Sequence, residues 1–347
     1  MPPQKTILLF GNYGGQNRGD EAILSGFIHL FPKDHFRIVV FSSHPQKTTK
    51  DHGVESFPFP PFGLRSLFRP SSYSFFRPLR QASIVFFGGG GLFQDREPFA
   101  VLLWSYFLFL VRCFAKRNTK VLLVGNSFGP LRFFFSRFLV RKVLRNIRFF
   151  SVRDTESKEL LQKIAHPNAI IEQATDFAFV LPKPRSLKSR KGTILALRGD
   201  GNISPERIQK VFNILPKPVS VIAMDEIDQK FAERLGVPVV NPKNTAELLH
   251  VFSQAKCVVT SRLHGGILSL IAETSFLIFS SAPKINSFFS DRNLAELVLS
   301  EKASPFIIRK KIKTVLSSSE KWQKEFRRVR KEEHQKKSLL FPLFLQK

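Results

Sequence analysis

Short apolar runs alternate with amphipathic stretches along most of the chain. Runs of strand length occupy residues 6–10, 37–41, 83–87, 120–124 and 149–152 in the first half, and 193–198, 218–224, 237–240, 256–260 and 276–280 in the second. Segments with helical periodicity follow many of them, among them residues 204–214, 226–235 and 245–254. Since strands that alternate with helices form parallel sheets covered on both faces, the pattern predicts an α/β fold with two parallel-sheet domains facing a cleft.

The domain boundary is predicted from length and from one polar stretch. A chain of 347 residues is long enough for two packed domains of about 150 residues each. Residues 182–191 are rich in Pro, Ser and charge, which is typical of a linker. We therefore predict an N-terminal domain at 1–181, a linker at 182–191, a C-terminal domain at 192–316 and a charged helical tail at 317–347.

Two stretches interrupt the alternation. Residues 57–80 are rich in Pro, Phe, Ser and Arg, which predicts an irregular loop that lies on a membrane interface, binds nucleic acid by stacking, or folds onto its own protein. Residues 99–111 are nearly all apolar, but a helix that crosses a membrane needs about 20 residues. We therefore predict a buried helix there, with interfacial insertion as the alternative.

The charge of the chain is strongly positive. There are 54 Lys and Arg against 27 Asp and Glu, a formal net charge of +27. Such a balance indicates anionic partners: phosphorylated small molecules, acidic lipid surfaces or nucleic acid. Charge alone does not choose among these three classes.

The basic residues are most concentrated between Arg132 and Arg148, where six cations occur without one acidic residue. On a helix, four of them fall within an arc of about 80° and leave Phe135 and Phe138 facing elsewhere. These four are Arg137, Arg141, Arg145 and Arg148. The stripe predicts binding of anionic lipid headgroups or of a charged substrate.

The compartment is predicted from the cysteines and the amino terminus. Cys113 and Cys257 lie in separate apolar runs, which suits reduced core residues better than a disulfide or a metal site. The first residues lack the charged-then-apolar pattern of a signal peptide. We expect a cytoplasmic protein, with peripheral binding to the inner face of the cell membrane as a further expectation.

Two glycine-rich segments follow predicted strands. The first, residues 11–21, precedes a helix expected from about Ala22, and its Asn17 and Asp20 are candidates for a cap or for contact with a ligand hydroxyl. The second contains four consecutive glycines, among them Gly89, Gly90 and Gly91, which allow close backbone approach to a phosphate or a sugar. A tight structural turn is the alternative for the first segment.

Cationic side chains stand where strands lead into helices. Arg153 and Arg198 follow two of the predicted strands, and Arg262 with His264 follows a third. Ligands of open α/β sheets bind at the carboxyl ends of the strands, near helix N-termini that attract anions. Arg262 is therefore a candidate anion-binding residue and His264 a candidate general acid. The alternative is an arginine on a loop and a hydrogen-bonded structural histidine.

Six motifs in order resemble those of the polysaccharide pyruvyl transferase family, over most of residues 6–290. They are Gly11-Asn-Tyr-Gly with Asn17-x-Gly-Asp-Glu-Ala-Ile-Leu24, Gly88-Gly-Gly-Gly-Leu-x-Gln-Asp95, Gly129-Pro130, Ser151-Val-Arg-Asp-x-x-Ser157, Thr175-Asp176, and Ser261-Arg-Leu-His264. The resemblance implies two Rossmann-like domains similar to the glycosyltransferase B-type fold. One departure is that Ser281-Ala282-Pro283-Lys284 stands where family members commonly have Tyr-Asp-Pro-Lys, which leaves the role of that Asp unassigned.

The activity that the resemblance implies is transfer of an enolpyruvyl unit from phosphoenolpyruvate to two hydroxyls of a sugar, as a cyclic ketal. The acceptor would be a cell-surface polysaccharide or its lipid-linked precursor. Phosphoenolpyruvate would be the donor substrate, with no separate cofactor and no metal. The predicted substrate-binding residues are Arg153, Arg262, Arg198, Asn17, Asp20, Gly89, Gly90 and Gly91, and the predicted catalytic residue is His264.

Two other functions fit parts of the sequence. A nucleotide-sugar glycosyltransferase of the same two-domain type would use the glycine segments and Arg262 for a diphosphate. A non-catalytic nucleic-acid-binding protein would explain the charge and the mixture of Phe and Arg. No nucleic-acid module motif is present in the sequence, so nucleic acid is not the expected partner.

Overall fold

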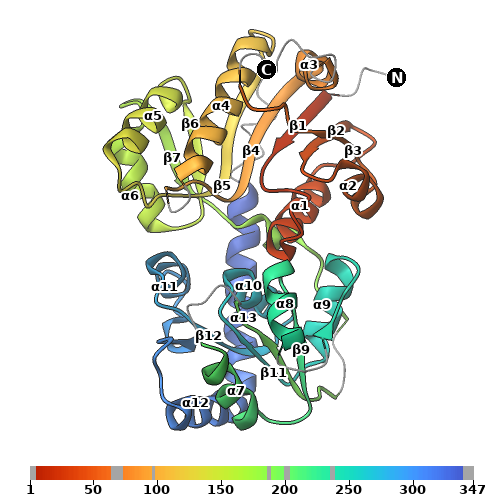
Figure 1. The fold of residues 1–347 in the computed structure, drawn as a ribbon, viewed down its shortest axis with the longest axis vertical. Coiled ribbons are helices and arrows are strands. Elements are labelled where there is room, and N and C mark those ends of the chain that lie inside the picture. The colour runs from red at the N-terminus through yellow and green to blue at the C-terminus, as the bar shows by residue number, and fades with distance from the viewer. Residues whose placement is uncertain are drawn as a thin grey trace. The chain divides into compact units, whose positions relative to one another are not determined.

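The computed structural model describes residues 5–63, 73–95, 98–185, 189–198, 204–234 and 239–338. They form two compact units. The first contains Ile23–Phe177 and the segment that ends at Gly15, and the second contains Gln16–Ala22 and Ala178–Gln335. In Figure 1 the colour runs from red to yellow-green over residues 23–177 of the first unit and from green to blue over residues 178–335 of the second.

The first unit is built on a parallel sheet. Within the described residues it has seven strands in the order β3-β2-β1-β4-β5-β6-β7. The strands are β1 (Lys5–Phe10), β2 (Phe36–Ser42), β3 (Glu55–Pro58), β4 (Ala82–Phe93), β5 (Lys120–Phe128), β6 (Phe149–Val152) and β7 (Ile170–Gln173). Each neighbouring pair is parallel, so all seven carboxyl ends lie along one edge.

Helices connect these strands, as parallel pairing requires. They are α1 (Arg18–Leu30), α2 (Pro45–His52), α3 (Tyr73–Gln81), α4 (Pro98–Phe114), α5 (Phe134–Leu144) and α6 (Thr155–Ile164). Helix α1 contributes its first residues to the second unit and the rest, from Ile23, to the first. No helix in the described residues has both the length and the apolar character needed to cross a membrane.

Phenylalanine rings fill much of the first core. Phe10 on the central strand β1 stacks between Phe41 of β2 and Phe87 of β4, with ring centroids 4.5 and 4.8 Å apart. Large rings on adjacent parallel strands bury much apolar surface, which is a main source of stability for this unit. Trp104 of α4 belongs to the same core and is almost fully buried.

The second unit has its own parallel sheet. Among the described residues it has six strands in the order β10-β9-β8-β11-β12-β13. These strands are β8 (Thr193–Ala196), β9 (Val219–Ile222), β10 (Val239–Val240), β11 (Cys257–Thr260), β12 (Ser275–Phe279) and β13 (Val298–Leu299). All neighbouring pairs are again parallel, which confirms the predicted α/β fold with two parallel sheets.

The second sheet is covered by helices and by a long carboxyl-terminal helix. The helices are α7 (Pro205–Ile214), α8 (Glu226–Arg234), α9 (Thr245–Gln254), α10 (Leu263–Ile271), α11 (Pro283–Ser290), α12 (Pro305–Ser317) and α13 (Ser319–Ser338), with short 3-10 turns η3 (Phe177–Val180) and η4 (Ala295–Leu297). Residues 319–338 of the predicted charged tail form a helix, of which Trp322, Phe326 and Val329 are buried in the core of this unit, and residues 339–347 lie outside the described residues.

Several local predictions were wrong. The helix expected from about Ala22 begins at Arg18. The second glycine segment is not a loop but the end of strand β4, because pairing with β5 continues past Gly90 and glycine accepts the positive φ angles of 78° at Gly89 and 72° at Gly90. Strand β5 likewise extends to Phe128, beyond the predicted end at residue 124.

Two further expectations need correction. Residues 57–80 are not irregular throughout: β3 ends at Pro58 and α3 begins at Tyr73, while 64–72 lie outside the described residues. Cys113 is exposed, because it lies on the solvent side of α4 rather than on the side that packs on the sheet. Cys257 is buried as predicted, and burial raises the pKa of its thiol to about 12.

Candidate functional site

In each unit the strand order reverses at one point of the sheet. In the second unit the reversal lies between β8 and β11, which pair with Ala196 opposite Thr260. Arg198 follows the first of these strands, and Arg262 with His264 follows the second. Ligands of open α/β sheets bind at such a reversal, beyond the carboxyl ends of the strands.

Arg262 is held by two carboxylates. Its Nε donates to Oδ2 of Asp228 at 3.0 Å and its Nη2 to Oδ1 of Asp228 at 2.5 Å, a forked contact, and Nη2 also donates to Asp225. Burial lowers the pKa of the Arg262 guanidinium, but hydrogen bonds and the charges of Asp228 and Asp225 outweigh this effect and raise it above its ordinary value. Arg262 is thus a fixed cation with little exposed surface.

The two aspartates were not identified from the sequence. Both follow β9, and Asp225 also accepts a hydrogen bond at 2.9 Å from the backbone N–H of Asp228 as helix α8 begins. The sequence does place two carboxylates, three residues apart, just after one predicted strand, and an arginine just after another. Their pairing with Arg262 could not be known without the strand order.

The turn before helix α10 is fixed by hydroxyl groups. Thr260 Oγ1 donates to the carbonyl of Ala196 at 2.8 Å and accepts from the backbone N–H of Arg262 at 3.0 Å. Ser261 Oγ accepts from the backbone N–H of Arg198 at 2.7 Å. Arg262 occupies the N-cap position of α10 without a side-chain cap. The first amides of this helix therefore provide an electropositive end next to Arg262 and His264.

The start of helix α1 belongs to the same unit and packs against His264. A Cβ atom built on Gly19 would lie only 2.6 Å from Cγ of His264, so glycine is needed for this approach. Asn17 caps the helix, with Oδ1 accepting from the Gly19 N–H at 2.9 Å, and Asp20 is buried in the first turn. The predicted residues Asn17 and Asp20 are thereby brought to the side of His264.

Arg18, which the sequence analysis did not single out, fixes this helix start. Its backbone N–H donates to the carbonyl of Met224 and its Nε to that of Ala223, each at 2.8 Å, and Nη1 donates to the carbonyl of Pro242. Burial lowers the pKa of the Arg18 guanidinium. Arg18 thus joins α1 to the ends of β9 and β10, which is a structural role. It occupies the variable position of the Asn17-x-Gly-Asp motif.

In the first unit, Arg153 lies in a buried polar network at the end of β6. Its Nε donates to Ser127 Oγ at 2.7 Å and its Nη1 to Oδ2 of Asp176 at 2.8 Å. Ser127 in turn donates to Oδ2 of Asp154 at 2.5 Å. The other carboxylate oxygen of Asp154 accepts from the Ser157 N–H at 2.9 Å, so Asp154 caps helix α6.

The glycine run of β4 lies at the strand reversal of the first unit, between β1 and β4. Two of these glycines are required by the packing of the protein itself. A Cβ atom added at Gly88 would collide with Phe27, and one added at Gly89 would collide with Ile23. Tyr13 also donates to the carbonyl of Gly88 at 2.8 Å. These contacts account for the first two glycines without a ligand.

Asn126 of β5 is a further candidate beside this run. It pairs with Gly90 across the strands, is fully buried, and donates from Nδ2 to the carbonyl of Phe87 at 2.8 Å. Its Oδ1 accepts no hydrogen bond from any described residue. Buried polar groups usually have a hydrogen-bond partner, so this amide oxygen is a candidate acceptor for a ligand hydroxyl. Asn126 was not identified from the sequence, because the predicted strand ended at residue 124.

The predicted site residues therefore form two groups. Asn17, Asp20, Arg198, Arg262 and His264 lie at the carboxyl edge of the second sheet, and Arg153 with Gly89–Gly91 lies at that of the first. Over the part of the chain that the structure describes, no group of three or more His, Cys, Asp or Glu side chains is placed to hold a metal ion.

Comparison with known proteins gives a family match and a fold. Residues 17–283 match the family model described as polysaccharide pyruvyl transferase. No curated protein sequence matches significantly.

Solved structures resemble the whole fold at low identity. Sucrose-phosphate synthase from Thermosynechococcus elongatus has a TM-score of 0.59 at 12% identity, with 98% of this chain and 99% of that chain covered. A putative UDP-N-acetylglucosamine 2-epimerase from Listeria monocytogenes has a TM-score of 0.58 at 11% sequence identity, with 94% of this chain and 91% of that chain covered. A glycosyltransferase from Rickettsia africae has a TM-score of 0.56 at 10% sequence identity, with 95% of this chain and 94% of that chain covered. The chain therefore has the glycosyltransferase B-type fold that the resemblance implied.

Proposed function

The chain belongs to the polysaccharide pyruvyl transferase family and is a transferase, and from this premise we propose that phosphoenolpyruvate is its donor. The acceptor would be a pair of hydroxyls on a sugar of a cell-surface polysaccharide or of its lipid-linked precursor. We place the reaction in the cytoplasm. The observation that carries the proposal is the arrangement at the reversal of the second sheet, where a fixed guanidinium, a helix N-terminus and an imidazole stand together.

The donor carries a phosphate and a carboxylate, and both are anions that arginine and helix N-termini bind well. Asp225 and Asp228 occupy Nε and Nη2 of Arg262. We therefore assign Nη1, together with the first amides of α10, to one anionic group of the donor. The carboxylates would keep the guanidinium in one orientation, so that little freedom is lost when the donor binds.

His264 is assigned as the general acid. In the proposed reaction a sugar hydroxyl attacks the substituted carbon of the enol while a proton is delivered to the methylene carbon, which becomes the methyl group. Phosphate then leaves with its bonding electrons and a second hydroxyl attacks the same carbon. Of the two protons that the hydroxyls release, one returns to His264 and the other is taken up by the departing phosphate. Histidine suits such a role because it exchanges protons near neutral pH, and packing against Gly19 fixes its ring.

Residues of the first unit are assigned to substrate binding. Arg153 and the backbone of Gly89–Gly91 remain the candidates there, and Asn126 Oδ1 is added as an acceptor for a sugar hydroxyl. Asn17, Asp20 and Arg198 are assigned to contacts around the donor in the second unit. Arg153 is already paired with Asp176, so it would bind a substrate anion through nitrogens that this pair does not use.

The test is acceptor-dependent release of phosphate from phosphoenolpyruvate. Purified protein is incubated with the donor and with soluble or lipid-linked saccharides, and the His264→Ala variant serves as the control. We expect release only when an acceptor and His264 are both present, with a ketal in the product by mass spectrometry. Turnover of a nucleotide sugar, with no phosphate released from phosphoenolpyruvate under any condition, would overturn the proposal.

A further inference from the structure

Helix α5 presents phenylalanine rings to solvent. Phe134 is 84% exposed and Phe138 is 55% exposed, and Phe133 and Phe135 are exposed to a similar degree. The opposite side of the helix, with Ser136, Val140 and Leu144, is buried in the first unit. The helix is therefore anchored without these four rings, and their exposure is not needed for packing.

Cations surround the rings. Arg137, Arg141, Lys142 and Arg145 are exposed on the same helix and at its end. We refer to these four cations and the four rings as the α5 surface. Phe135 and Phe138 were predicted to face away from the cations; for Phe138 this prediction was wrong, since its ring lines a pocket together with Arg141, Lys142 and Arg145. The stripe is thus aromatic as well as cationic.

The charged residues of this segment of the sequence are all cations. Residues 132–148 contain no Asp or Glu, and within the described ranges none of the cations of the α5 surface forms an ion pair. Ordinary solvated helix faces mix charges of both signs, as α13 does with Arg328, Glu325 and Glu332. Unbalanced cations of this kind attract an anionic partner.

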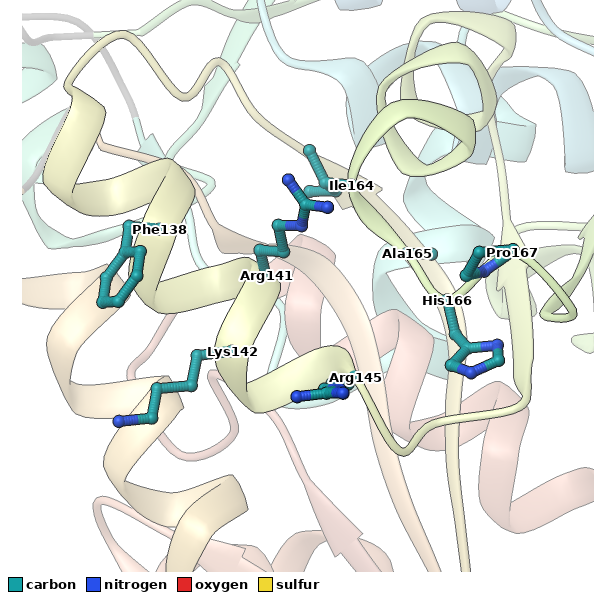
Figure 2. A pocket seen from close by; sticks show the side chains of 8 residues that line it. All are labelled: Phe138, Arg141, Lys142, Arg145, Ile164, Ala165, His166 and Pro167. Atoms are coloured by element: carbon teal, nitrogen blue, oxygen red, sulfur yellow. The ribbon is translucent and has the colours of Figure 1, made fainter.

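A pocket of about 530 Å³ opens at the carboxyl-terminal half of the helix. Phe138, Arg141, Lys142 and Arg145 line one side, and residues 164–167 at the end of α6 line the other. Figure 2 shows Phe138, Arg141, Lys142 and Arg145 on α5, and His166 with Pro167 on the turn that follows α6. Cationic walls next to apolar ones suit a phosphate that carries an apolar group.

We propose that the α5 surface docks this protein on an anionic lipid bilayer. The phenyl rings enter the boundary between headgroups and acyl chains, the cations bind lipid phosphates, and the pocket holds one phosphate headgroup. Phe134 and Phe138 are about one helical turn apart, so these exposed rings lie on the same side of α5 as Arg141 and Arg145. Rings next to cations on one helix face are typical of a membrane interface, whereas stacking on nucleic-acid bases uses rings spaced along a groove. The bilayer is therefore the partner that the surface fits best.

The test is flotation with vesicles of equimolar phosphatidylcholine and phosphatidylglycerol. The first variant combines Arg141→Gln, Lys142→Gln and Arg145→Gln. Each cation near an anionic surface contributes about fivefold to binding, so this variant should bind about a hundredfold more weakly. The matched control combines Lys47→Gln, Lys50→Gln and Lys324→Gln, which are exposed on other helices and remove the same charge. The control should bind nearly as well as the wild type.

A second variant removes the rings but keeps the charge. Phe134→Ser combined with Phe138→Ser should lose the binding that persists at high salt, because salt screens the cations but not the apolar contact. Circular dichroism checks that each variant is folded, which is expected because the altered side chains are exposed.

The proposal is overturned if either α5 variant floats like the wild type, or if the control loses as much binding as the first variant. It is also overturned if the first variant keeps vesicle binding but loses binding to an RNA oligonucleotide, which would make the surface a nucleic-acid site. Flotation needs neither donor nor acceptor, so its result is independent of the proposed pyruvyl transfer.

Discussion

Gly19 and His264 lie in contact in the second unit, so close that a Cβ atom on Gly19 would be 2.6 Å from Cγ of the imidazole. Real Cβ atoms do not approach a neighbour to this distance. Helix α1 therefore begins with a residue that has no side chain at the point where the ring is held. This contact makes the position of the proposed general acid dependent on a residue far away in sequence.

Gly19→Ala is expected to displace the His264 ring and to lower kcat by about tenfold or more, since misplacement by an ångström can cost up to about a hundredfold. Overpacking should also cost about 1–3 kcal/mol of folding stability. Gly15→Ala is the control, because its Cβ would meet only Asn12 O at an ordinary 3.5 Å. Phosphate release and thermal melting are measured for both. Normal turnover in folded Gly19→Ala would contradict the importance of the contact.

His264→Ala is expected to lower kcat by about 10²–10⁴-fold while the affinity for phosphoenolpyruvate stays within about tenfold. General acid catalysis acts on the transition state, so donor binding should be nearly unaffected. Turnover, calorimetric titration and melting are measured on the same variant. If affinity and rate both collapse, His264 binds the phosphate of the donor. If kcat is normal in the folded variant, the role of His264 is structural only.

Arg262→Lys is expected to weaken donor binding although the charge is kept. Lysine cannot reproduce the forked contact with Asp228, so its cation would no longer be held in one orientation. Arg207→Lys is a control in the same unit, where the guanidinium donates to the carbonyl of Ala303. Binding curves for phosphoenolpyruvate are compared. Superimposable curves for wild type and Arg262→Lys would remove Arg262 from the donor site.

A pH-dependent contribution to stability is expected from Glu273. Burial would raise the pKa of this carboxyl, but hydrogen bonds and the charges of Lys183 and Arg327 outweigh burial and lower it below the ordinary 4.5. A lowered pKa in the folded state stabilises the protein above the unfolded pKa, and this contribution is lost as the pH falls through the folded value.

Glu273→Gln should therefore lower the melting temperature at pH 7, and its difference from wild type should shrink below about pH 4.5. The control is Glu233→Gln on α8, which changes an exposed carboxylate. Thermal melting is followed across the acid range for all three proteins. A difference that stays constant down to the most acid pH would show that the ion pairs of Glu273 are not its source.

The pattern of apolar and polar residues was sufficient to predict the alternation of strands and helices and the position of Arg262 and His264 at a strand end. Both depend on short-range periodicity. Periodicity does not say which strands are neighbours in the sheet. The pairing of Arg262 with Asp225 and Asp228 depends on the strand order, so it could not be predicted either. These carboxylates follow β9, which is separated from β11 by β8 in the sheet.

Local errors had a common cause, namely that tertiary contacts overrode local preference. Glycines normally interrupt strands, but in β4 pairing with β5 continues past Gly90. Phe138 was expected away from the cations from helical spacing, yet it lines a pocket beside Arg141 and Arg145, because Val140 and Leu144 already fill the packed side of α5. Cys113 was assigned to the core from its apolar neighbours, although α4 has a solvent side as well.

The distribution of tryptophan has a practical consequence. The chain contains only two, and they are divided between the cores: Trp104 is buried in the first unit and Trp322 in the second. Each unit thus carries its own intrinsic fluorophore. With Trp104→Phe or Trp322→Phe, the emission that remains reports on one unit alone, so denaturation of the two sheets can be followed separately without an added label.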